Sequence, residues 1–194
     1  MQRIIFCLIV LFTLLATPNL YSDARKKDAM EKLVTVAPVA LMYGRVALNG
    51  EIALNDKSAF QPHLDIWNWS SGDWELSWTG LGASYHIFPN DTAPAGFFWG
   101  PKVDLMMISA KYAYTIMRYY SDVGYISTVT AEESKGNIIV IGIDLGYRWI
   151  FKGGFTIDLG GNVYYGMGEV TVANQKAPVG GAGIAPTINI GLAF

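Results

Sequence analysis

Ser84 and His86 are the residues whose types and spacing come closest to a catalytic arrangement. A serine nucleophile needs a histidine base within hydrogen-bond reach, and a carboxylate orients that base. Residues two apart on a strand share a face, but they lie about 6–7 Å apart, which is loose for proton transfer. We therefore expect His86 to be a structural histidine. His63 and Asp65 repeat this spacing, and we expect them to belong to a polar network.

The sequence shows no convincing metal, cofactor or phosphate motif. Its two histidines are too few for a metal site. Gly180, Gly181 and Gly183 precede a strand-like segment rather than a helix, so they do not form a phosphate-binding loop. We expect no enzymatic activity, no metal and no cofactor.

The composition is that of a membrane protein. The chain has 194 residues, of which 52% are hydrophobic and 15% charged, whereas soluble domains carry about 25% charged residues. This hydrophobicity excludes intrinsic disorder. The net charge of −2 and the scattered basic residues argue against nucleic-acid binding. No apolar run reaches the ~18–20 residues of a spanning helix, so the apolar residues must be arranged differently.

Residues 1–24 have the form of a secretory signal peptide, with cleavage expected near Ala24. A basic start precedes an apolar run over residues 4–16, which is short for the alternative, a retained membrane anchor. Cys7 is the only cysteine and lies inside that run. We therefore expect no lipid attachment and no disulfide in the domain of residues 25–194.

Residues 139–151 alternate between large apolar side chains at odd positions and small or charged ones at most even positions. Residues 155–163 and 187–194 repeat this period of two. A single strand of a soluble sandwich can look the same, but small and polar residues inside with apolar residues outside are typical of a membrane barrel. Turn signals then predict eight strands, at residues 39–54, 60–69, 74–88, 97–119, 124–130, 137–151, 155–172 and 183–194.

Eight is an even number, as an antiparallel up-and-down transmembrane barrel requires, and closure leaves no open edge in hydrocarbon. Parity places the start of the first strand and Phe194 at one rim. Short periplasmic turns and longer outer loops are the expected asymmetry. The tight connections predicted at the Phe194 rim are 70–73, 121–123 and 152–154, and the longer ones predicted opposite are 55–59, 89–96, 131–136 and 173–182.

Aromatic residues flank the predicted tight turns, which favours a membrane-interface girdle at the Phe194 rim, although soluble β proteins also place aromatics beside turns. The predicted girdle consists of Trp67, Trp69, Trp74, Tyr119, Tyr120, Tyr125, Trp149, Phe151, Phe155 and Phe194. Phe88, Phe97, Phe98 and Trp99 are expected at the opposite rim.

Three positions complicate the strand pattern. Pro38 marks the expected start of the first strand, because proline cannot donate to a ladder. Asn49 and Gly50 are a hairpin signal, but a turn there would leave too short a strand, so we expect them in-strand or at a bulge. The alternation slips after Gly80, which predicts a bulge at Gly80 and Leu81.

The predicted lumen contains charges of both signs. Eight strands leave an interior just wide enough for side chains, and opposite charges should pair there because an unpaired buried charge is costly. We expect a plugged polar lumen rather than a conducting path. The predicted inward residues are Arg45, Glu51, His63, Asp65, Glu75, Lys102, Asp104, Asp144, Arg148, Asp158 and Asn162.

The carboxy-terminal residues resemble the recognition strand of Gram-negative outer-membrane barrels, in which alternating apolar residues precede a final aromatic. The matching positions are Ile188, Ile190, Leu192 and Phe194. LGASYHIFP at residues 81–89, followed by AGFFWGP at 95–101, is similar to small barrel domains of the OmpX/OmpA-like type. The resemblance implies an outer-membrane location and contact with the outer-membrane barrel assembly machinery, but it is poor evidence for function.

We expect an integral outer-membrane barrel, monomeric and surrounded by outer-membrane lipid, with a structural or loop-mediated recognition role. One alternative is a lipid A- or phospholipid-acting enzyme using Ser84 and His86. Against it, these residues are predicted to face inward, and their order is the reverse of the His-x-Ser of the lipid A deacylases. The other alternative is a soluble secreted lipid-binding β-barrel or sandwich.

Overall fold

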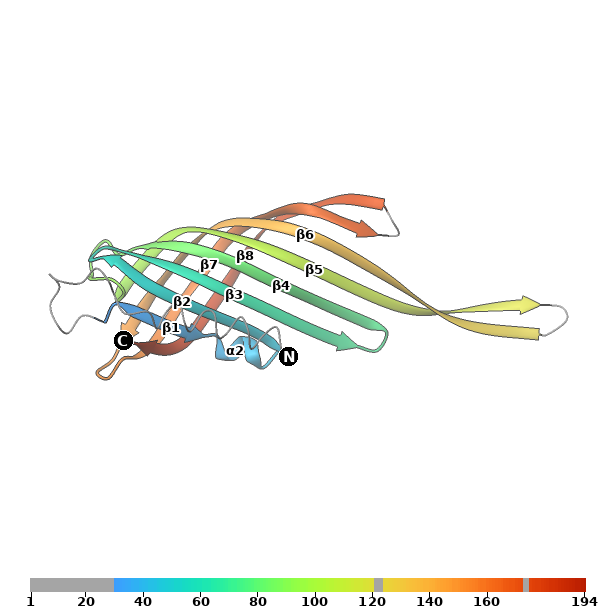
Figure 1. Ribbon diagram of the computed structural model, residues 1–194, viewed down its shortest axis with the longest axis horizontal. Helices are drawn as coiled ribbons and strands as arrows, with labels where there is room; N and C mark the ends of the chain where they lie inside the picture. Colours follow the sequence, from blue (N-terminus) through green and yellow to red (C-terminus); the bar gives the residue numbers. More distant parts are fainter. Residues whose placement is uncertain (1–29, 121–123, 173–174) are drawn as a thin grey trace.

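The computed structural model describes residues 30–120, 124–172 and 175–194, and within its strands the side chains of residues 114–131 and 172 are not described. Eight antiparallel strands follow one another around a closed ring (Figure 1). The strands are β1 (Lys32–Val36), β2 (Arg45–Asn55), β3 (Ser58–Ser71), β4 (Trp74–Ile87), β5 (Gly96–Tyr120), β6 (Gly124–Ile150), β7 (Phe155–Val172) and β8 (Gln175–Ala193). The predicted all-β ring of eight antiparallel strands is confirmed.

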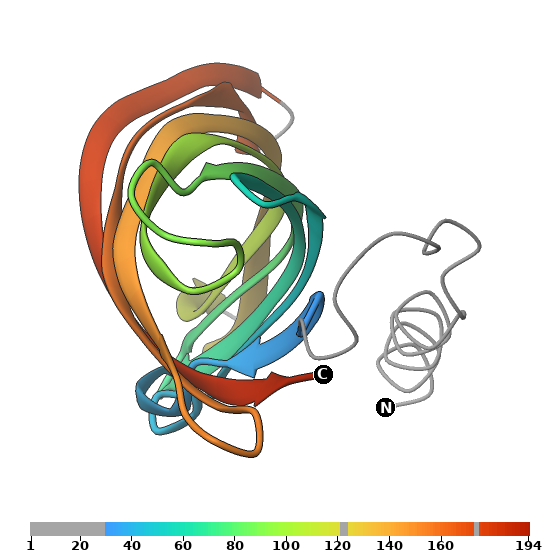
Figure 2. The same ribbon diagram turned by 90° about the vertical axis from the view of Figure 1, so that its left-hand side faces the viewer.

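The ring closes where β1 pairs with β8, from Leu33 opposite Ala193 to Val36 opposite Ile190. Two backbone hydrogen bonds between Lys32 and Phe194, of 2.9 and 2.8 Å, extend this pairing. Seen from the end that contains Phe194, the strands surround a common interior (Figure 2). We call this end the terminal end and the opposite one the hairpin end.

Two predicted boundaries are wrong, and their errors cancel in the strand count. Residues 39–41 do not start a strand but belong to the short helix α2 (Pro38–Leu41), which separates the additional strand β1 from β2. Residues 131–136 do not form a connection, because they pair with β5 from Ala113 opposite Ala131 to Ile108 opposite Gly136. The predicted fifth and sixth strands are thus one continuous strand, β6.

This change of boundaries also corrects the predicted rims. The connection at 72–73 lies at the hairpin end, where Ser71 pairs with Trp74, and not beside Phe194. The connections at the terminal end are 56–57, 88–95 and 151–154. The β5–β6 hairpin continues far past its neighbours at the hairpin end (Figure 1). The longer extensions therefore still lie opposite Phe194, although they are strands rather than loops.

The register settles both irregular positions. Asn49 and Gly50 lie within β2, opposite Thr35 and Val34, which confirms an in-strand placement. The predicted bulge at Gly80 is wrong, since the ladder between β3 and β4 runs without a shift. The alternation slips there because Trp78, on the same face as Gly80 and Gly82, is an aromatic residue that points inward.

The outer face of the strands changes character at similar ladder positions. On β5, outward positions are exposed and apolar from Trp99 to Met107, and Ser109 and Lys111 follow. On β6 the outward residues from Ile139 to Trp149 are 41–50% exposed. Towards the hairpin end, polar residues adjoin one another in successive ladders: Asn68, Ser77, Ser109, Lys135 and Thr171.

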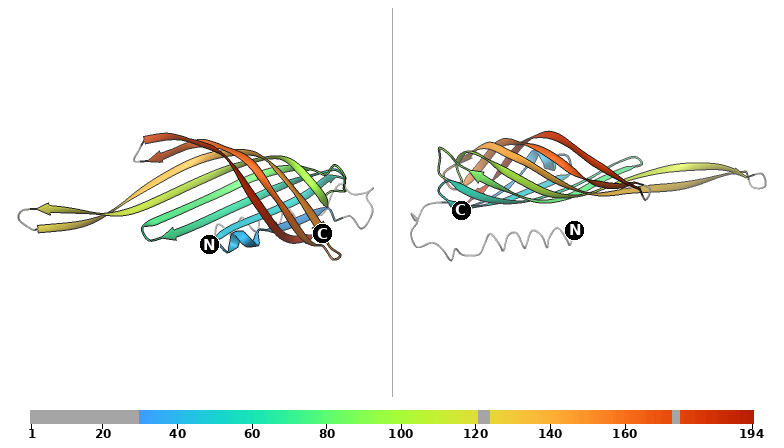
Figure 3. Two further views of the ribbon diagram at one scale, coloured as in Figure 1. Left: turned by 180° about the vertical axis from the view of Figure 1, so that it is seen from behind. Right: turned by 90° about the horizontal axis from the view of Figure 1, so that it is seen from above.

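The ring is irregular where β1 is short. β1 pairs with β8 only at residues 190–193, so β8 from Gln175 to Asn189 has β7 as its single strand partner among the described residues. The distance between β8 and α2 increases towards the hairpin end, where β8 begins (Figure 3, left). We call the boundary between this edge of β8 and α2 with the start of β2 the β8 seam.

Candidate functional site

Arg148 is the centre of a buried ion network in the terminal half of the lumen. Its guanidinium donates to both oxygens of Asp158, at 2.8 and 2.9 Å, and to both oxygens of Glu51. It also donates to the carbonyl of Pro94 in the 88–95 connection, at 3.0 Å. The guanidinium carbon lies 5.0 Å from the centre of the Phe98 ring. Together these contacts fill the lumen where the 88–95 connection folds against it.

His86 extends this network to the opposite wall. Its Nδ1 lies 2.8 Å from Glu51, and its Nε2 lies 3.7 Å from Asp144. Ser84 donates to that same Asp144 carboxylate, at 2.5 Å. Gln61 donates to Glu51 at 3.2 Å. The network thus includes Gln61, which sequence reasoning missed, and also Ser84 and His86, which it placed on the inward face without naming them as network members.

Their signal was the parity of β4. Gly80, Gly82, Ser84 and His86 occupy alternate positions, and all are more buried than the intervening Leu81 and Tyr85. The run of small and polar residues marks the inward face once Trp78 is allowed on it. The large tryptophan hid this pattern only before Gly80, because apolar residues were expected outside.

A second ion cluster lies closer to the hairpin end of the lumen. His63 Nε2 is bonded to Asp104, and Lys102 lies 3.5 Å from the other oxygen of that carboxylate. Gly82 is directly opposite, and a Cβ atom there would collide with the side chains of Asp104 and His63. The glycine therefore makes room for the pair beneath β4.

Arg45 and Asp65 form the ion pair nearest the hairpin end. The Nε of Arg45 lies 2.9 Å from both oxygens of Asp65. Trp78 donates to Asp65 at 3.3 Å, and its ring lies 5.9 Å from the guanidinium carbon of Arg45. Trp67 stacks on Trp78 with 4.2 Å between ring centres, and donates to the carbonyl of Tyr43 at 2.7 Å. This last bond ties the segment after α2 to the wall.

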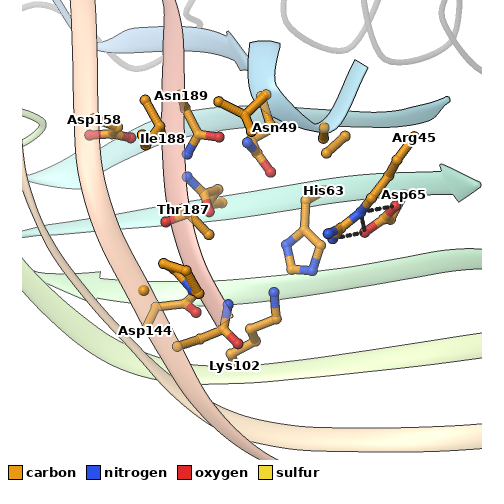
Figure 4. A pocket seen from close by; sticks show the side chains of 18 of the residues that line it. Arg45, Asn49, His63, Asp65, Lys102, Asp144, Asp158, Thr187, Ile188 and Asn189 are labelled. Carbon is orange, nitrogen blue, oxygen red and sulfur yellow. Dashed lines mark hydrogen bonds and ion pairs between the residues drawn. The ribbon is translucent and has the colours of Figure 1, made fainter. Parts of the chain in front are cut away.

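Between the two halves lies a cavity of about 420 Å³. Figure 4 shows His63, Arg45, Asp65 and Lys102 on one side, with Asp144, Asp158, Thr187 and Asn189 also lining it. The cavity reaches the β8 seam, whose lining residues are Ala37, Val39, Ala40, Tyr43 and Ala47 on one side and Pro186, Thr187, Ile188 and Asn189 on the other. The cavity is bordered by His86, Asp144 and Asp158 of the terminal network and by Arg45 and Asp65 towards the hairpin end.

Two of the predicted lumen residues lie apart from these networks. Glu75 is on the outward face of β4, with its side chain 65% exposed and 3.7 Å from Lys111. The parity of β4 explains this, because Glu75 alternates with the inward Trp74 and Leu76. Asn162 lines the cavity, but its side chain has no hydrogen-bond partner in the described part of the chain. The other nine take part in the ion pairs above.

The aromatic residues of the predicted girdle do not gather at one rim, so that prediction is wrong. Trp67, Trp69 and Trp74 lie near the hairpin end, and they share faces with inward residues of β3 and β4. Trp149, Phe151, Phe155 and Phe194 lie at the terminal end. Tyr119, Tyr120 and Tyr125 lie at the tip of the β5–β6 hairpin, where side chains are not described.

The residues expected opposite Phe194 also need correction. Phe88, Phe97, Phe98 and Trp99 lie in and after the 88–95 connection, at the terminal end. Phe88 and Phe98 are buried, with ring centres 5.9 Å apart, whereas Phe97 and Trp99 face outward. The extra strand β1 reverses the end to which this connection belongs.

The chemistry available to Ser84 and His86 is limited by their partners. Ser84 donates to Asp144 and not to His86, and both side chains are buried. No hydrogen bond joins Ser84 to His86 within the described ranges.

The described residues hold no group of three or more metal-ligating side chains. No described helix is long and apolar enough to cross a membrane.

A charged surface lies on the outer face beyond the apolar positions. Glu133 accepts from Ser109 at 3.2 Å and lies 3.0 Å from Lys135. The bond from Lys135 lowers the pKa of the exposed Glu133 carboxyl below its ordinary value. Lys176 and Glu169 form a similar pair at 3.1 Å. These pairs make the outer surface near the hairpin end polar.

No family model, curated protein or solved structure matches this chain.

Proposed function

We propose that this protein is an integral outer-membrane β-barrel with a largely plugged polar lumen, and that it has a structural role or a recognition role at the hairpin end. It would be a monomer that reaches the outer membrane after cleavage near Ala24. The apolar positions ending at Phe194 would contact the assembly machinery.

The outward apolar band is the observation that carries this proposal. A transmembrane strand needs about 9–11 residues, and the outward apolar positions of β5 extend from Trp99 to Met107. Neighbouring strands carry similar bands, and polar residues replace them towards the hairpin end in successive ladders. A soluble barrel would instead bury its apolar face and expose its charges.

The interior supports the same proposal. Arg148, Glu51 and Asp158 are almost completely buried inside the ring. Ions of both signs face one another there, so this buried cluster satisfies its own charges without bulk water. This arrangement favours a mechanical or binding role over conduction.

The β5–β6 hairpin supports recognition as the second part of the proposal. Its backbone ladder continues from Ala113 opposite Ala131 to Tyr120 opposite Gly124, beyond Tyr112, the last residue of β5 that pairs with β4. In an outer-membrane barrel, long extensions opposite the termini reach outside the cell. A partner would meet this hairpin first.

The test compares two substitutions on the outward face of β5. Arginine costs about 2–4 kcal/mol at the bilayer midplane and about 0–1 kcal/mol near its interfaces. Leu105→Arg should therefore strongly reduce insertion into vesicles, while the matched control Ser109→Arg should insert nearly normally. Insertion is measured by the heat-dependent band shift in detergent gels and by resistance to carbonate extraction.

Equal insertion of the two variants would contradict the proposed membrane band. A chain that is a stable monomer in buffer without detergent would favour the soluble lipid-binding alternative. Altered lipid A after expression, lost in Ser84→Ala, would favour the enzyme.

A further inference from the structure

We propose that the lumen cavity binds a single-chain amphiphile with an uncharged polar head, which enters from the bilayer through the β8 seam. This inference rests on the proposed membrane location. It assigns the cavity a ligand class and an entrance through the side of the barrel.

The wall of the ring is incomplete along β8. β8 has no strand partner on its β1-facing side from Gln175 to Asn189 within the described residues. An open sheet edge is unfavourable in hydrocarbon, because its N–H and C=O groups need partners. Pro178 and Pro186 each remove one donor from this strand, as is typical of edge strands. The sequence of β8 is thus suited to an edge.

The unpaired edge of β8 lies beside exposed apolar side chains. Ile184 and Ile188 are exposed on the outer face of the segment of β8 that lacks a partner on its β1-facing side. On the other side they pair with Val163 and Leu159 of β7. Both partners are also exposed and apolar. On the other side of the seam, α2 and the residue after it expose Val39, Leu41 and Met42. The seam therefore lies at the level of the apolar band.

The β8 seam is continuous with the cavity. Ala37, Val39 and Ala40 line the cavity from α2, and Pro186 and Ile188 line it from β8. A volume of about 420 Å³ is within the range of small-ligand sites, about 300–1,000 Å³. These apolar residues at the entrance suit an alkyl chain.

The polar side chains of the cavity indicate the kind of head group that it can bind. Most charged groups of the cavity are already paired, Arg45 with Asp65, Lys102 with Asp104, and Asp158 with Arg148, and the remaining one, Asp144, accepts a hydrogen bond from Ser84. An ionic head would have to compete with these pairs. Asn162, Thr187 and Asn189 also line the cavity, and in the described part of the chain their side chains have no hydrogen-bond partner. Hydroxyl groups of a ligand can form hydrogen bonds with these two amides and with the threonine hydroxyl. The head is therefore expected to be uncharged.

The experiment uses the refolded full barrel in lipid nanodiscs and 1-monooleoylglycerol as the probe. Native mass spectrometry counts the bound probe, and the heat-dependent band shift reports folding in the same samples. Oleate and glycerol serve as the charged and the chainless comparison ligands. We expect one saturable monooleoylglycerol per barrel, binding at least tenfold more tightly than oleate, and no glycerol binding.

Three variants locate the site. Ala47→Trp fills the cavity and should abolish binding. The matched control Ala83→Trp places the same side chain on the outward face of β4 and should bind normally. Asn189→Leu keeps the approximate size of the side chain but removes its amide, and should weaken binding about tenfold.

Equal binding by all three variants, tighter binding of oleate, or a dimer without bound probe would overturn this inference. Each of these results leaves the proposed membrane location intact if the band shift persists. Loss of the band shift and of insertion in the unaltered protein would instead defeat the proposed function itself.

Discussion

Two arginines of the lumen have the same kinds of partner but very different surroundings. Arg148 and Arg45 each pair with an aspartate on the neighbouring strand, and each lies over an aromatic ring. The Arg148 side chain is 0% exposed, whereas that of Arg45 is 42% exposed. The difference teaches that similar ion pairs can act as a buried structural core at one end and as the polar edge of a cavity at the other.

Arg148→Met should have the largest effect on stability. It leaves the carboxylates of Glu51 and Asp158 buried without their cation, which costs about 3–5 kcal/mol. Arg45→Met is the matched variant, and it should cost about 1 kcal/mol or less because water reaches the remaining Asp65. Urea titration of the heat-dependent band shift measures both. Similar losses would show that the two halves of the lumen do not differ as described.

A triple variant tests whether that loss comes from uncompensated charge. Adding Glu51→Gln and Asp158→Asn to Arg148→Met removes both stranded carboxylates while keeping their approximate volumes. Replacement of a whole buried ion cluster is often close to neutral, so most of the lost stability should return in the same urea titration. No recovery would mean that the hydrogen bonds of Arg148, including that to Pro94, matter more than its charge.

Asp144→Leu tests the part of the network around Ser84 and His86 and should have an intermediate effect. It leaves the buried Ser84 hydroxyl without its acceptor and removes the carboxylate that lies 3.7 Å from His86 Nε2, and an unsatisfied buried group costs about 1–3 kcal/mol. Asn162 lines the same cavity. Its substitution Asn162→Leu removes no described hydrogen bond and should change stability less. Thermal unfolding in detergent compares the pair, and an unchanged midpoint for Asp144→Leu would count against the network.

The smallest effect is expected on the charged outer surface. Lys135→Ala should raise the pKa of Glu133 towards its ordinary value, since the bond from Lys135 is the main cause of its lowering. A lowered carboxyl pKa favours the folded state at higher pH, and this contribution disappears as pH falls through the folded-state pKa. Titration by NMR with labelled glutamate measures the shift, and an unmoved pKa would rule out the pair.

Periodicity predicted the ring well, because inward and outward faces alternate with a period of two in any strand. The odd positions from Ile139 to Trp149 are exposed and the even ones are less so, as the sequence indicates. Nine of the eleven predicted lumen residues take part in the ion pairs of the interior. Composition and alternation are local properties, and the chain shows them directly.

Strand boundaries and rims could not be predicted in the same way, because they depend on pairing. Residues 131–136 look like a polar connection, yet they are held in β6 by the long partner strand β5. β1 has only 5 residues and merges with the alternation of β2 in the sequence. Trp78 faces inward beside Arg45 and Asp65, and Trp67 stacks on it, and these contacts between strands are not contained in the periodicity of the sequence.

The short closure between β1 and β8 has a consequence for how the molecule assembles. Every other ladder joins strands that are consecutive along the chain, so each hairpin can form from local segments. Among the described strands, only the pairing of Leu33 with Ala193 and its neighbours joins distant segments, and such contacts form slowly because of the entropy of loop closure. A curved, open sheet is therefore the natural precursor, and its last step is a short zipper whose rate can be followed separately from hairpin formation.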